Sequence, residues 1–429
     1  MEIYVVQPGD SLYQISRNFG VSVARIQTDN GLGREQRLVP GQALVILRPS
    51  QIYTVRAGDT LYGIARANQT TVIRLVQNNP DLAENDVLYP GRVLTIRFEG
   101  ERDRNLITGG YAYPFINRSV LRRALPYLTT LSAFSYGFTA TGELISPHDD
   151  TLLSDALLFQ VIPVLVLTAI DEQGGFNPAR IKMLIEDIAL QNKVLDNVLT
   201  VMKEKGYQGM DADFEFIPAE DAEGYFSFLR NAHNRLAQNG FFLNVDLAPK
   251  TSGQQPGLLY EAHNYRVIGE IADTVFLMTY EWGYTYGPPM AVAPIDQVRS
   301  VVSYAVSVIP REKIRLGIPN YAYDWQLPFL KGMSRAYTMG NESAVRRAIQ
   351  YGAEIQFDET AQSPWFEYWR NGQKHVVWFE DARSIQEKLK LAEEFQLPGV
   401  GYWNLMHAFS QNWALVNVTN RVQKGNWSV

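Results

Sequence analysis

Three carboxylates alternate within one short apolar segment, "GMDADFE" at residues 209–215. Asp211, Asp213 and Glu215 occupy every second position, and side chains at this spacing point to the same face of a β-strand. Three ionised carboxylates held this close with little water would repel one another, so at least one should hold a proton near neutral pH. A carboxyl group that holds a proton can act as a general acid. The segment therefore predicts acid–base chemistry, with Glu215, the last of the three, placed to meet a substrate.

The elements that must hold this segment follow a regular alternation after residue 106. Short β-rich segments alternate with helical stretches such as 178–205, 220–238 and 294–307. The eight strand candidates are 107–113, 130–136, 160–168, 209–215, 242–248, 274–280, 314–321 and 399–404. Strands that alternate with helices call for a parallel sheet covered by helices. We therefore predict an α/β fold, a (β/α)8 TIM barrel over residues 106–429.

In such a barrel the side chains of the fourth strand alternate between the lumen and the helix layer. We expect Met210, Ala212, Phe214 and Phe216 to pack outward and the three acids to point inward. A hydrogen-bonded polar network without chemistry is the alternative, but barrel cores are normally filled with branched apolar residues. The long connection at about 322–398 is interpreted as a small α+β insertion on the face where barrel loops build active sites.

The first part of the chain is a tandem repeat. The segment "IYVVQPGDSLYQIS" at 3–16 matches "IYTVRAGDTLYGIA" at 52–65, and "PGQALVI" at 40–46 matches "PGRVLTI" at 90–96. Each copy contains a short β-branched strand, a Gly-Asp turn, a helix begun by an Asp, Ser or Thr cap, a second short helix and a closing strand. The pattern predicts two βααβ modules.

The two modules, residues 1–48 and 51–97, resemble LysM domains, which bind peptidoglycan and chitin. The resemblance rests on the "GDSL" and "GDTL" turns, the Asn that ends the second helix, and "PGQ" or "PGR" before the last strand. It implies that N-acetylglucosamine chains lie between the first turn and the loop before the last strand. The residues concerned are Gly9, Asp10, Ser11, Leu12, Gly58, Asp59, Thr60 and Leu61. Asp10 and Asp59 also suit a purely local role in capping and turns, and both readings stay open.

The acidic segment resembles the DGxDxDxE signature of family 18 glycoside hydrolases, with Gln208 in place of the first Asp. The resemblance implies a retaining enzyme in which the 2-acetamido group of the substrate acts as nucleophile, an exception to the two-carboxylate rule. It implies that Glu215 protonates the glycosidic oxygen and later activates water. Asp213 would orient the acetamido group, and Asp211 would tune Asp213.

Two further segments resemble motifs of the same family. "MTYEW" at 278–282 is similar to a strand-six motif, which implies that Tyr280 contacts the acetamido oxygen. "GYWN" at 401–404 is similar to a strand-eight motif, which implies that Trp403 lies under the distorted sugar, where an aromatic face suits an apolar pyranose face. Glu281 stands where many members have Asp, so the sugar contacts at this position stay open.

Composition and motifs argue against several function classes. The formal charge of −6 gives no basic surface for nucleic acid, and no apolar run approaches the ~20 residues that span a bilayer. The chain has no cysteine, and its five histidines show no metal-ligand spacing, so we expect no metal and no cofactor. The N-terminal segment "MEIYVVQPGD" lacks the pattern of a secretory signal peptide. We expect a monomer that binds neither nucleic acid nor membranes.

Twin modules joined to such a barrel resemble the spore cortex-lytic glucosaminidases of endospore-forming bacteria. This resemblance implies cleavage of N-acetylglucosaminyl bonds in cortex peptidoglycan during germination, and a location in the coat and cortex region of the spore, reached from the mother cell without a signal peptide. A chitinase is the alternative within the enzyme class. A sugar-binding protein with an inactive barrel is the alternative outside it, and the presence of Glu215 argues against that one.

Overall fold

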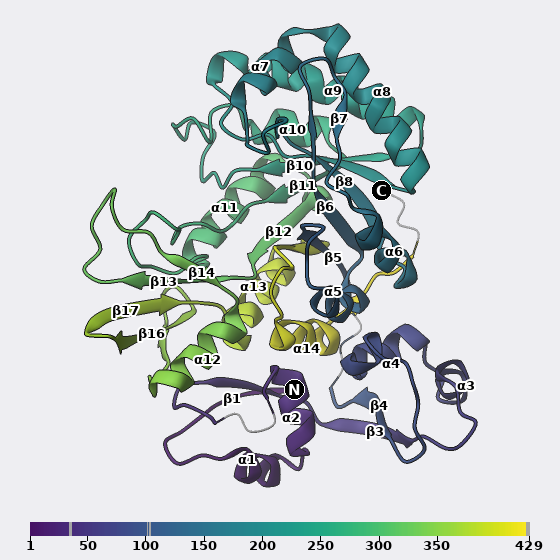
Figure 1. The fold of residues 1–429 in the computed structure, drawn as a ribbon, viewed down its shortest axis with the longest axis vertical. Helices are drawn as coiled ribbons and strands as arrows, with labels where there is room; N and C mark the ends of the chain where they lie inside the picture. The colour runs from purple at the N-terminus through teal and green to yellow at the C-terminus, as the bar shows by residue number, and fades with distance from the viewer. Residues whose placement is uncertain (34–36, 101, 103, 426–429) are drawn as a thin grey trace.

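A closed barrel of eight parallel strands forms the main body of the chain (Figure 1). The computed structural model describes residues 1–429 apart from 34–36, 101, 103 and 426–429. The barrel strands are β5 (Asn105–Ala112), β6 (Thr130–Phe138), β8 (Ile162–Leu167), β9 (Gly209–Ala212), β10 (Phe242–Leu247), β11 (Thr274–Leu277), β12 (Ile314–Pro319) and β18 (Gly399–Trp403). They pair in this order, and β5 pairs with both β18 and β6, which closes the ring. The predicted TIM barrel is confirmed.

Helices and short turns cover the outside of the barrel. They are α5 (Arg118–Ala124), α6 (Asp150–Leu158), α7 (Pro178–Glu186), α8 (Ile188–Lys205), α9 (Ala222–Gln238), α10 (Tyr265–Ile271), α11 (Ile295–Val308), α13 (Ala382–Glu394), α14 (Ser410–Thr419) and the turns η2 (Leu125–Tyr127), η3 (Ala219–Asp221) and η4 (Arg311–Lys313). The predicted helical stretch 178–205 is divided at Asp187, whose side chain caps α8. Two small strands lie beside barrel strands: β7 (Leu144–Ile145) pairs with β6, and β19 (Arg421–Val422) pairs with β5. None of the described helices has the length and apolar character needed to cross a membrane.

Strands β9 and β11 each end three residues earlier than the sequence predicts. Strand β9 ends at Ala212, so the last two acids lie on the loop that follows, although the backbone N–H of Asp213 still donates to the carbonyl of Leu167 at 3.1 Å. The prediction that Phe216 packs outward is wrong, because its backbone turns to φ +57° and 48% of the side chain is exposed. A left-handed residue ends the alternation of faces on which that prediction depended.

The long connection before the last barrel strand carries its own sheet. Strands β13 (Ala322–Gln326), β14 (Tyr337–Met339), β15 (Gln356–Asp358), β16 (Ser363–Arg370) and β17 (Gln373–Trp378) are antiparallel, in the order β14-β13-β17-β16-β15. Helix α12 (Asn341–Tyr351) packs on this sheet around Phe366. The range predicted for the insertion also contains α13, which packs against β18 and α11 as a barrel helix.

The N-terminal modules have the predicted βααβ order. The first contains β1 (Glu2–Val5), α1 (Leu12–Phe19), α2 (Val23–Asn30) and β2 (Ala43–Ile46), and the second contains β3 (Pro49–Thr54), α3 (Leu61–Ala67), α4 (Val72–Asn78), η1 (Pro80–Ala83) and β4 (Val93–Phe98). Ser11 and Thr60 cap α1 and α3 through their side-chain oxygens. Buried Asn30 and Asn79 each bind the backbone of the closing strand, which explains why both copies keep an Asn there.

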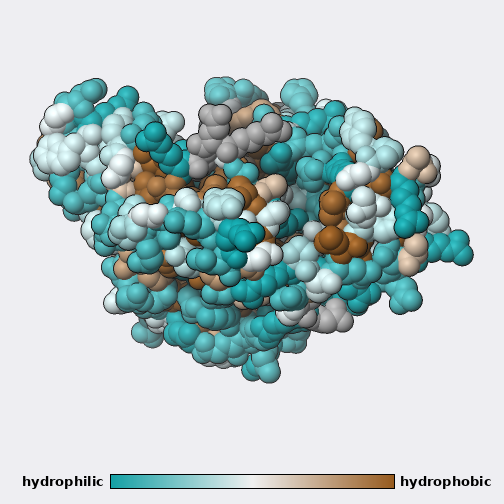
Figure 2. Space-filling view, turned by 90° about the horizontal axis from the view of Figure 1, so that it is seen from below, coloured by the Kyte–Doolittle hydropathy of each residue, from teal (hydrophilic) through white to brown (hydrophobic). Residues whose placement is uncertain are grey.

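Helix α14 joins both modules to the barrel (Figure 1). Near its start, the amide of Gln411 donates to Asn30 Oδ1 at 3.0 Å and to the carbonyl of Ala43 at 2.8 Å in the first module. Near its end, the amide of Asn417 donates to Asn78 Oδ1 at 2.8 Å in the second module, and Arg74 donates to Asn417 Oδ1 at 2.6 Å. Seen from the side of the modules, the surface is largely hydrophilic, and hydrophobic side chains gather in recesses (Figure 2).

A buried ion pair links the end of the inserted sheet to α13. Lys388 Nζ lies 2.8 Å from Glu380 Oε2, and both residues are at most 1% exposed. Because removal of one partner leaves a buried charge without its counterion, we expect Lys388→Met to lower the free energy of unfolding by about 3 to 5 kcal/mol. The double variant Lys388→Met/Glu380→Gln should recover most of that loss. Urea denaturation of both variants tests this, and equal losses in the two would contradict it.

Candidate active site

The deep end of the acidic row is a hydrogen-bonded network inside the barrel. The hydroxyl of Tyr111 lies 2.6 Å from Asp211 Oδ2 and 2.7 Å from Asp246 Oδ1. The amide of Asn244 donates to Asp211 Oδ1 at 2.7 Å and to Asp246 Oδ1 at 3.2 Å. Burial raises the pKa of Asp211, and the hydrogen bonds from Tyr111 and Asn244 oppose that rise. Burial and the charges of Asp211 and Asp213 hold the pKa of Asp246 well above its usual range, so Asp246 keeps a proton.

Asp213 lies above this network and is held differently. It is 8% exposed, and its Oδ1 is buried without a hydrogen-bond partner in the described part of the chain. Burial, followed by the charges of Glu215 and Asp211, raises the pKa of Asp213 well above its usual range. A buried carboxyl group in this position binds a proton and has a free oxygen with which to contact a ligand.

Glu215 is the half-buried member of the row, at the open end of the barrel. Burial, and then the charge of Glu281, raises the pKa of Glu215. The loop that carries Glu215 is held from below by His263, whose Nδ1 accepts from the backbone N–H of Ala248 at 2.9 Å and whose Nε2 lies 3.1 Å from the carbonyl of Phe214. Burial lowers the pKa of His263 to about 4, so the ring stays neutral and its Nε2–H donates.

The loop after β11 supplies the next two predicted residues. Tyr280 is 7% exposed, and burial followed by the charges of Asp246 and Asp213 raises its pKa well above the usual range. Glu281, in a left-handed conformation, accepts hydrogen bonds from the hydroxyls of Tyr321 and Tyr323. A cavity of about 390 Å³ lies beside Tyr280 and Glu281. The three acids do not line this cavity, and it is the electrostatic interactions of Tyr280 with Asp213 and of Glu281 with Glu215 that place these two residues near the acidic row.

Trp403 ends strand β18 within a group of aromatic rings. Its ring centroid lies 4.8 Å from that of Phe134, 5.6 Å from that of Tyr111 and 6.2 Å from that of Tyr113, all in edge-to-face arrangements. Edge-to-face packing of this kind is favourable for aromatic pairs and fixes the plane of the indole. Because Tyr111 also contacts Asp211, the same ring links Trp403 to the acidic network.

The predicted residues of the two modules lie outside this cluster. Asp10 and Asp59 accept hydrogen bonds from the hydroxyls of Tyr4 and Tyr53, at 2.6 and 2.9 Å, and from the backbone of the same turn. These contacts account for the conformation of each turn, whereas the side chains of Ser11 and Thr60 are engaged as helix caps. Gly9 and Gly58 are exposed at the tips, and Leu12 and Leu61 are half-buried beneath them.

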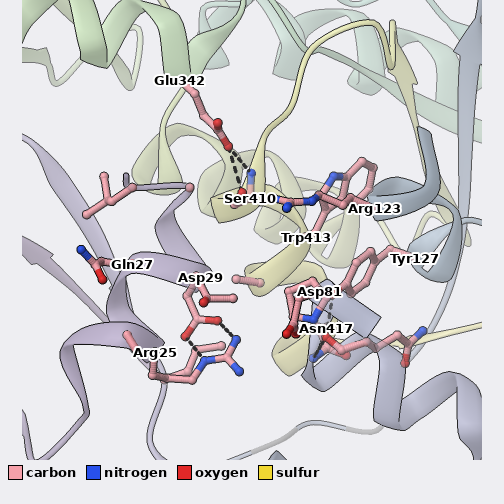
Figure 3. A pocket seen from close by; sticks show the side chains of 18 of the residues that line it. Arg25, Gln27, Asp29, Asp81, Arg123, Tyr127, Glu342, Ser410, Trp413 and Asn417 are labelled. Atoms are coloured by element: carbon pink, nitrogen blue, oxygen red, sulfur yellow. Dashed lines mark hydrogen bonds and ion pairs between the residues drawn. The ribbon is translucent and has the colours of Figure 1, made fainter. Parts of the chain in front are cut away.

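A separate cavity of about 620 Å³ lies where the modules meet α12 and α14 (Figure 3). Arg25 pairs with Asp29 on one side, and Glu342 accepts hydrogen bonds from the backbone and hydroxyl of Ser410 on the other. None of the predicted site residues lines this cavity. It lies at the interface between the LysM modules and the rest of the chain. Among the described residues, no group of three His, Cys, Asp or Glu side chains could hold a metal ion.

Comparison with known proteins places this geometry in a family. The model of glycosyl hydrolases family 18 matches residues 173–408, and the LysM domain model matches residues 4–47 and 53–97. The chain belongs to glycosyl hydrolase family 18. It is 38% identical over 423 residues to the cortical fragment-lytic enzyme of Bacillus cereus, with 97% of each chain covered. The predicted glycoside hydrolase and its LysM domains are thereby confirmed.

Solved structures agree with this assignment. The spore cortex-lytic enzyme SleL of Bacillus megaterium is 37% identical, with a TM-score of 0.83 over 98% of each chain. A chitinase of Chromobacterium violaceum is 23% identical, with a TM-score of 0.67 over 72% of this chain and 98% of its own, and this likeness shows the fold alone.

Four residues of this candidate site were not predicted from the sequence: Tyr111, Asn244, Asp246 and His263. Two of them carry a signal of the kind used for the acidic row, because Asn244 and Asp246 also alternate in an apolar strand, "FLNVDLA" at 242–248. Their register beside β9 puts Asn244 opposite Asp211. Nothing in the local sequence distinguishes Tyr111 or His263 from ordinary core residues.

The buried proton of Asp246 predicts a pH-dependent stability in this hydrolase. Because the folded chain binds this proton more tightly than the unfolded chain, the contribution to stability is complete below about pH 4 and is lost as the pH rises through the raised folded pKa. Asp246→Asn removes this loss, so its free energy of unfolding relative to wild type should increase from pH 4 to pH 8. Urea denaturation at both values measures the difference. The exposed Asp296→Asn is the control, and a difference independent of pH would contradict the prediction.

Proposed function

We propose that the chain is a peptidoglycan N-acetylglucosaminidase that cleaves N-acetylglucosaminyl bonds of spore cortex peptidoglycan during germination. The observation that carries the proposal is the row of acids in a family 18 barrel, which runs from the bonded Asp211 to the half-exposed Glu215. Similarity over 97% of the chain to enzymes named as cortical fragment-lytic supports the substrate and a location in the spore.

The first chemical step is assigned to Glu215. Its raised pKa favours the protonated carboxyl, which donates that proton to the glycosidic oxygen as the bond between this oxygen and the anomeric carbon breaks. The acetamido oxygen of the substrate attacks the anomeric carbon from the other face and forms an oxazolinium ion. Water then attacks the same carbon as its bond to the acetamido oxygen breaks, and gives a proton to Glu215, which restores the acid and the acetamido group and retains the configuration.

The neighbours of Glu215 hold the acetamido group during this step. Asp213 orients and stabilises the acetamido group as the oxazolinium ion forms, and the charge of Asp211 adds to burial and the charge of Glu215 in raising the pKa of Asp213. The hydroxyl of Tyr280 contacts the acetamido oxygen. Trp403 supports the apolar face of the distorted sugar. Glu281 contacts a sugar hydroxyl while its own position is set by Tyr321 and Tyr323.

The LysM domains hold the same polymer outside the barrel. The candidate contacts with the glycan lie on the first turn, which comprises Gly9, Asp10, Ser11 and Leu12 in one domain and Gly58, Asp59, Thr60 and Leu61 in the other. A bound domain raises the local concentration of glycan at the barrel without any new contact in the catalytic site.

The charge of Glu281 predicts a shift in the pH profile of hydrolysis. Since this charge raises the pKa of Glu215, its removal in Glu281→Gln should lower that pKa, and the alkaline limb of kcat/KM should move to lower pH. Initial rates on soluble cortex fragments across the pH range measure the limb. The surface variant Glu220→Gln is the matched control and should keep the wild-type limb. A limb that stays in place or moves upward in Glu281→Gln would refute the assignment.

Removal of the proposed acid tests the function directly. We expect Glu215→Gln to fold normally and to lower kcat on cortex fragments by about 100- to 10,000-fold, because general acid catalysis typically contributes that much. Reduction of the products with borohydride and mass spectrometry identify the new reducing ends. Reduced N-acetylglucosamine ends with wild type alone support the proposal. Ends from chitin oligomers only would favour a chitinase, and muramic ends or equal activity of the variant would overturn the mechanism.

A further inference from the structure

The two LysM domains have the same local architecture but different neighbours. In each, the loop before the closing strand is bonded to the residue that precedes the first turn: Gly41 N–H donates to Val6 O at 2.9 Å, and Gly91 N–H donates to Val55 O at 2.8 Å. The turn and the loop therefore form adjoining walls of one surface in both domains. Any difference in access to that surface comes from what the rest of the chain places against it.

In the first domain the insertion covers the loop before the closing strand. Val39 is 6% exposed and belongs to the core of the inserted sheet. The backbone N–H of Ile355 donates to the carbonyl of Pro40 at 3.0 Å, and Arg383 donates to the carbonyl of Gly41 at 3.2 Å. A Cβ atom on Gly41 would lie 1.8 Å from the carbonyl oxygen of Ile355. No sugar fits between this loop and the insertion.

In the second domain the same wall is open. Tyr89, which occupies the position of Val39, is 61% exposed. A Cβ atom on Gly91 would meet nothing within 4 Å, although its φ of +90° is close to the +80° of Gly41. Tyr62, on the first helix beside the turn, is 69% exposed, as is the matching Tyr13 of the first domain at 68%, so Tyr89 is the aromatic residue that distinguishes the two surfaces. Two exposed aromatic side chains flank the walls here, and aromatic faces suit the apolar face of a pyranose ring.

The closing strands, β2 in the first domain and β4 in the second, also differ in how exposed their outward side chains are. In β2 and the residue after it, the side chains that point away from the domain's own core are Ala43, Val45 and Leu47. They are at most 3% exposed and belong to the main core, where β2 packs on α13 and α14. At two of the three matching positions of the second domain the side chains are exposed, Val93 to 55% and Arg97 also, whereas the third, Thr95, is 6% exposed. A strand that is buried on both faces belongs to the interior of a larger unit. Figure 1 shows the first domain directly beneath α12 and α14.

We infer that the two LysM domains have divided roles: the second binds the glycan through an open surface that includes Tyr62 and Tyr89, whereas the first supports the insertion and α14. The glycan-binding part of this inference rests on the proposed function. It places one glycan-binding LysM site, not two, on each molecule.

Matched variants in the two domains test the assignment of binding. The full chain with Glu215→Gln and Trp403→Ala, which weakens retention by the barrel, is sedimented with insoluble peptidoglycan sacculi at a series of concentrations. Tyr62→Ala/Tyr89→Ala should weaken retention by about tenfold through loss of the aromatic contacts, and Tyr13→Ala, at the position that matches Tyr62, should leave retention unchanged.

Two outcomes overturn the division of roles. Equal losses from the two sets of variants would mean that both domains bind. No loss from either would mean that the second domain does not hold the glycan, and in that case hydrolysis of soluble fragments by the otherwise unaltered enzyme still tests the proposed function separately.

The two glycines test the supporting role of the first domain. Gly41→Ala and Gly91→Ala carry the same backbone strain, because both residues have φ near +85°, so any difference between them reports the contact with Ile355. We expect Gly41→Ala to lower Tm more than Gly91→Ala. Val39→Ala, a milder change at the same contact, should also lower Tm. Equal shifts for the two glycine variants, with no shift for Val39→Ala, would overturn the supporting role.

Discussion

The burial of several carboxyl groups inside one barrel is the constraint on which the candidate catalytic site depends. Taking an ionised carboxylate out of water costs several kcal/mol unless it is paired, hydrogen-bonded or protonated. Here Tyr111 and Asn244 stabilise the charge of Asp211, and the neighbouring Asp246 keeps its proton. One negative charge at the base then raises the proton affinity of the groups above it. At the open end, burial and the charge of Glu281 raise the pKa of Glu215, so the proton there is held by groups near the rim and not by the base of the barrel.

The short strands separate this support from the reacting groups. Strands β9 and β11 end before Asp213 and Tyr280, so the hydrogen-bonded base lies within the sheet and the groups assigned to the substrate lie on the first residues of the loops. Those loops are held by contacts from their neighbours, such as His263 on Phe214 and Tyr323 on Glu281. Loops held in this way keep side chains in place as firmly as a strand while leaving them accessible.

Sequence patterns predicted what depends on periodicity and repetition. The alternation of strands and helices gave the barrel, the duplicated turns gave two βααβ modules, and the spacing of Asp211, Asp213 and Glu215 located the acidic row. Patterns failed where a single backbone angle or a distant contact decides, as at Phe216, whose left-handed conformation ends the alternation. Tyr111 was missed because its partner Asp211 lies 100 residues away, and no local pattern encodes such a pair.

The buried outer face of β2 bears on how this protein could be taken apart or recombined. LysM domains strung on flexible linkers can be deleted, duplicated or grafted onto another enzyme. Here deletion of the first domain would expose the apolar surface of α13 and α14 that Ala43, Val45 and Leu47 cover, and exposed apolar patches promote association. The first domain therefore cannot be removed or transferred as an independent unit. The second keeps Val93 and Arg97 of its closing strand exposed, but α4 and η1 also pack on the barrel, where Gln77 bonds the backbone of Pro126 and Glu84 pairs with Arg123.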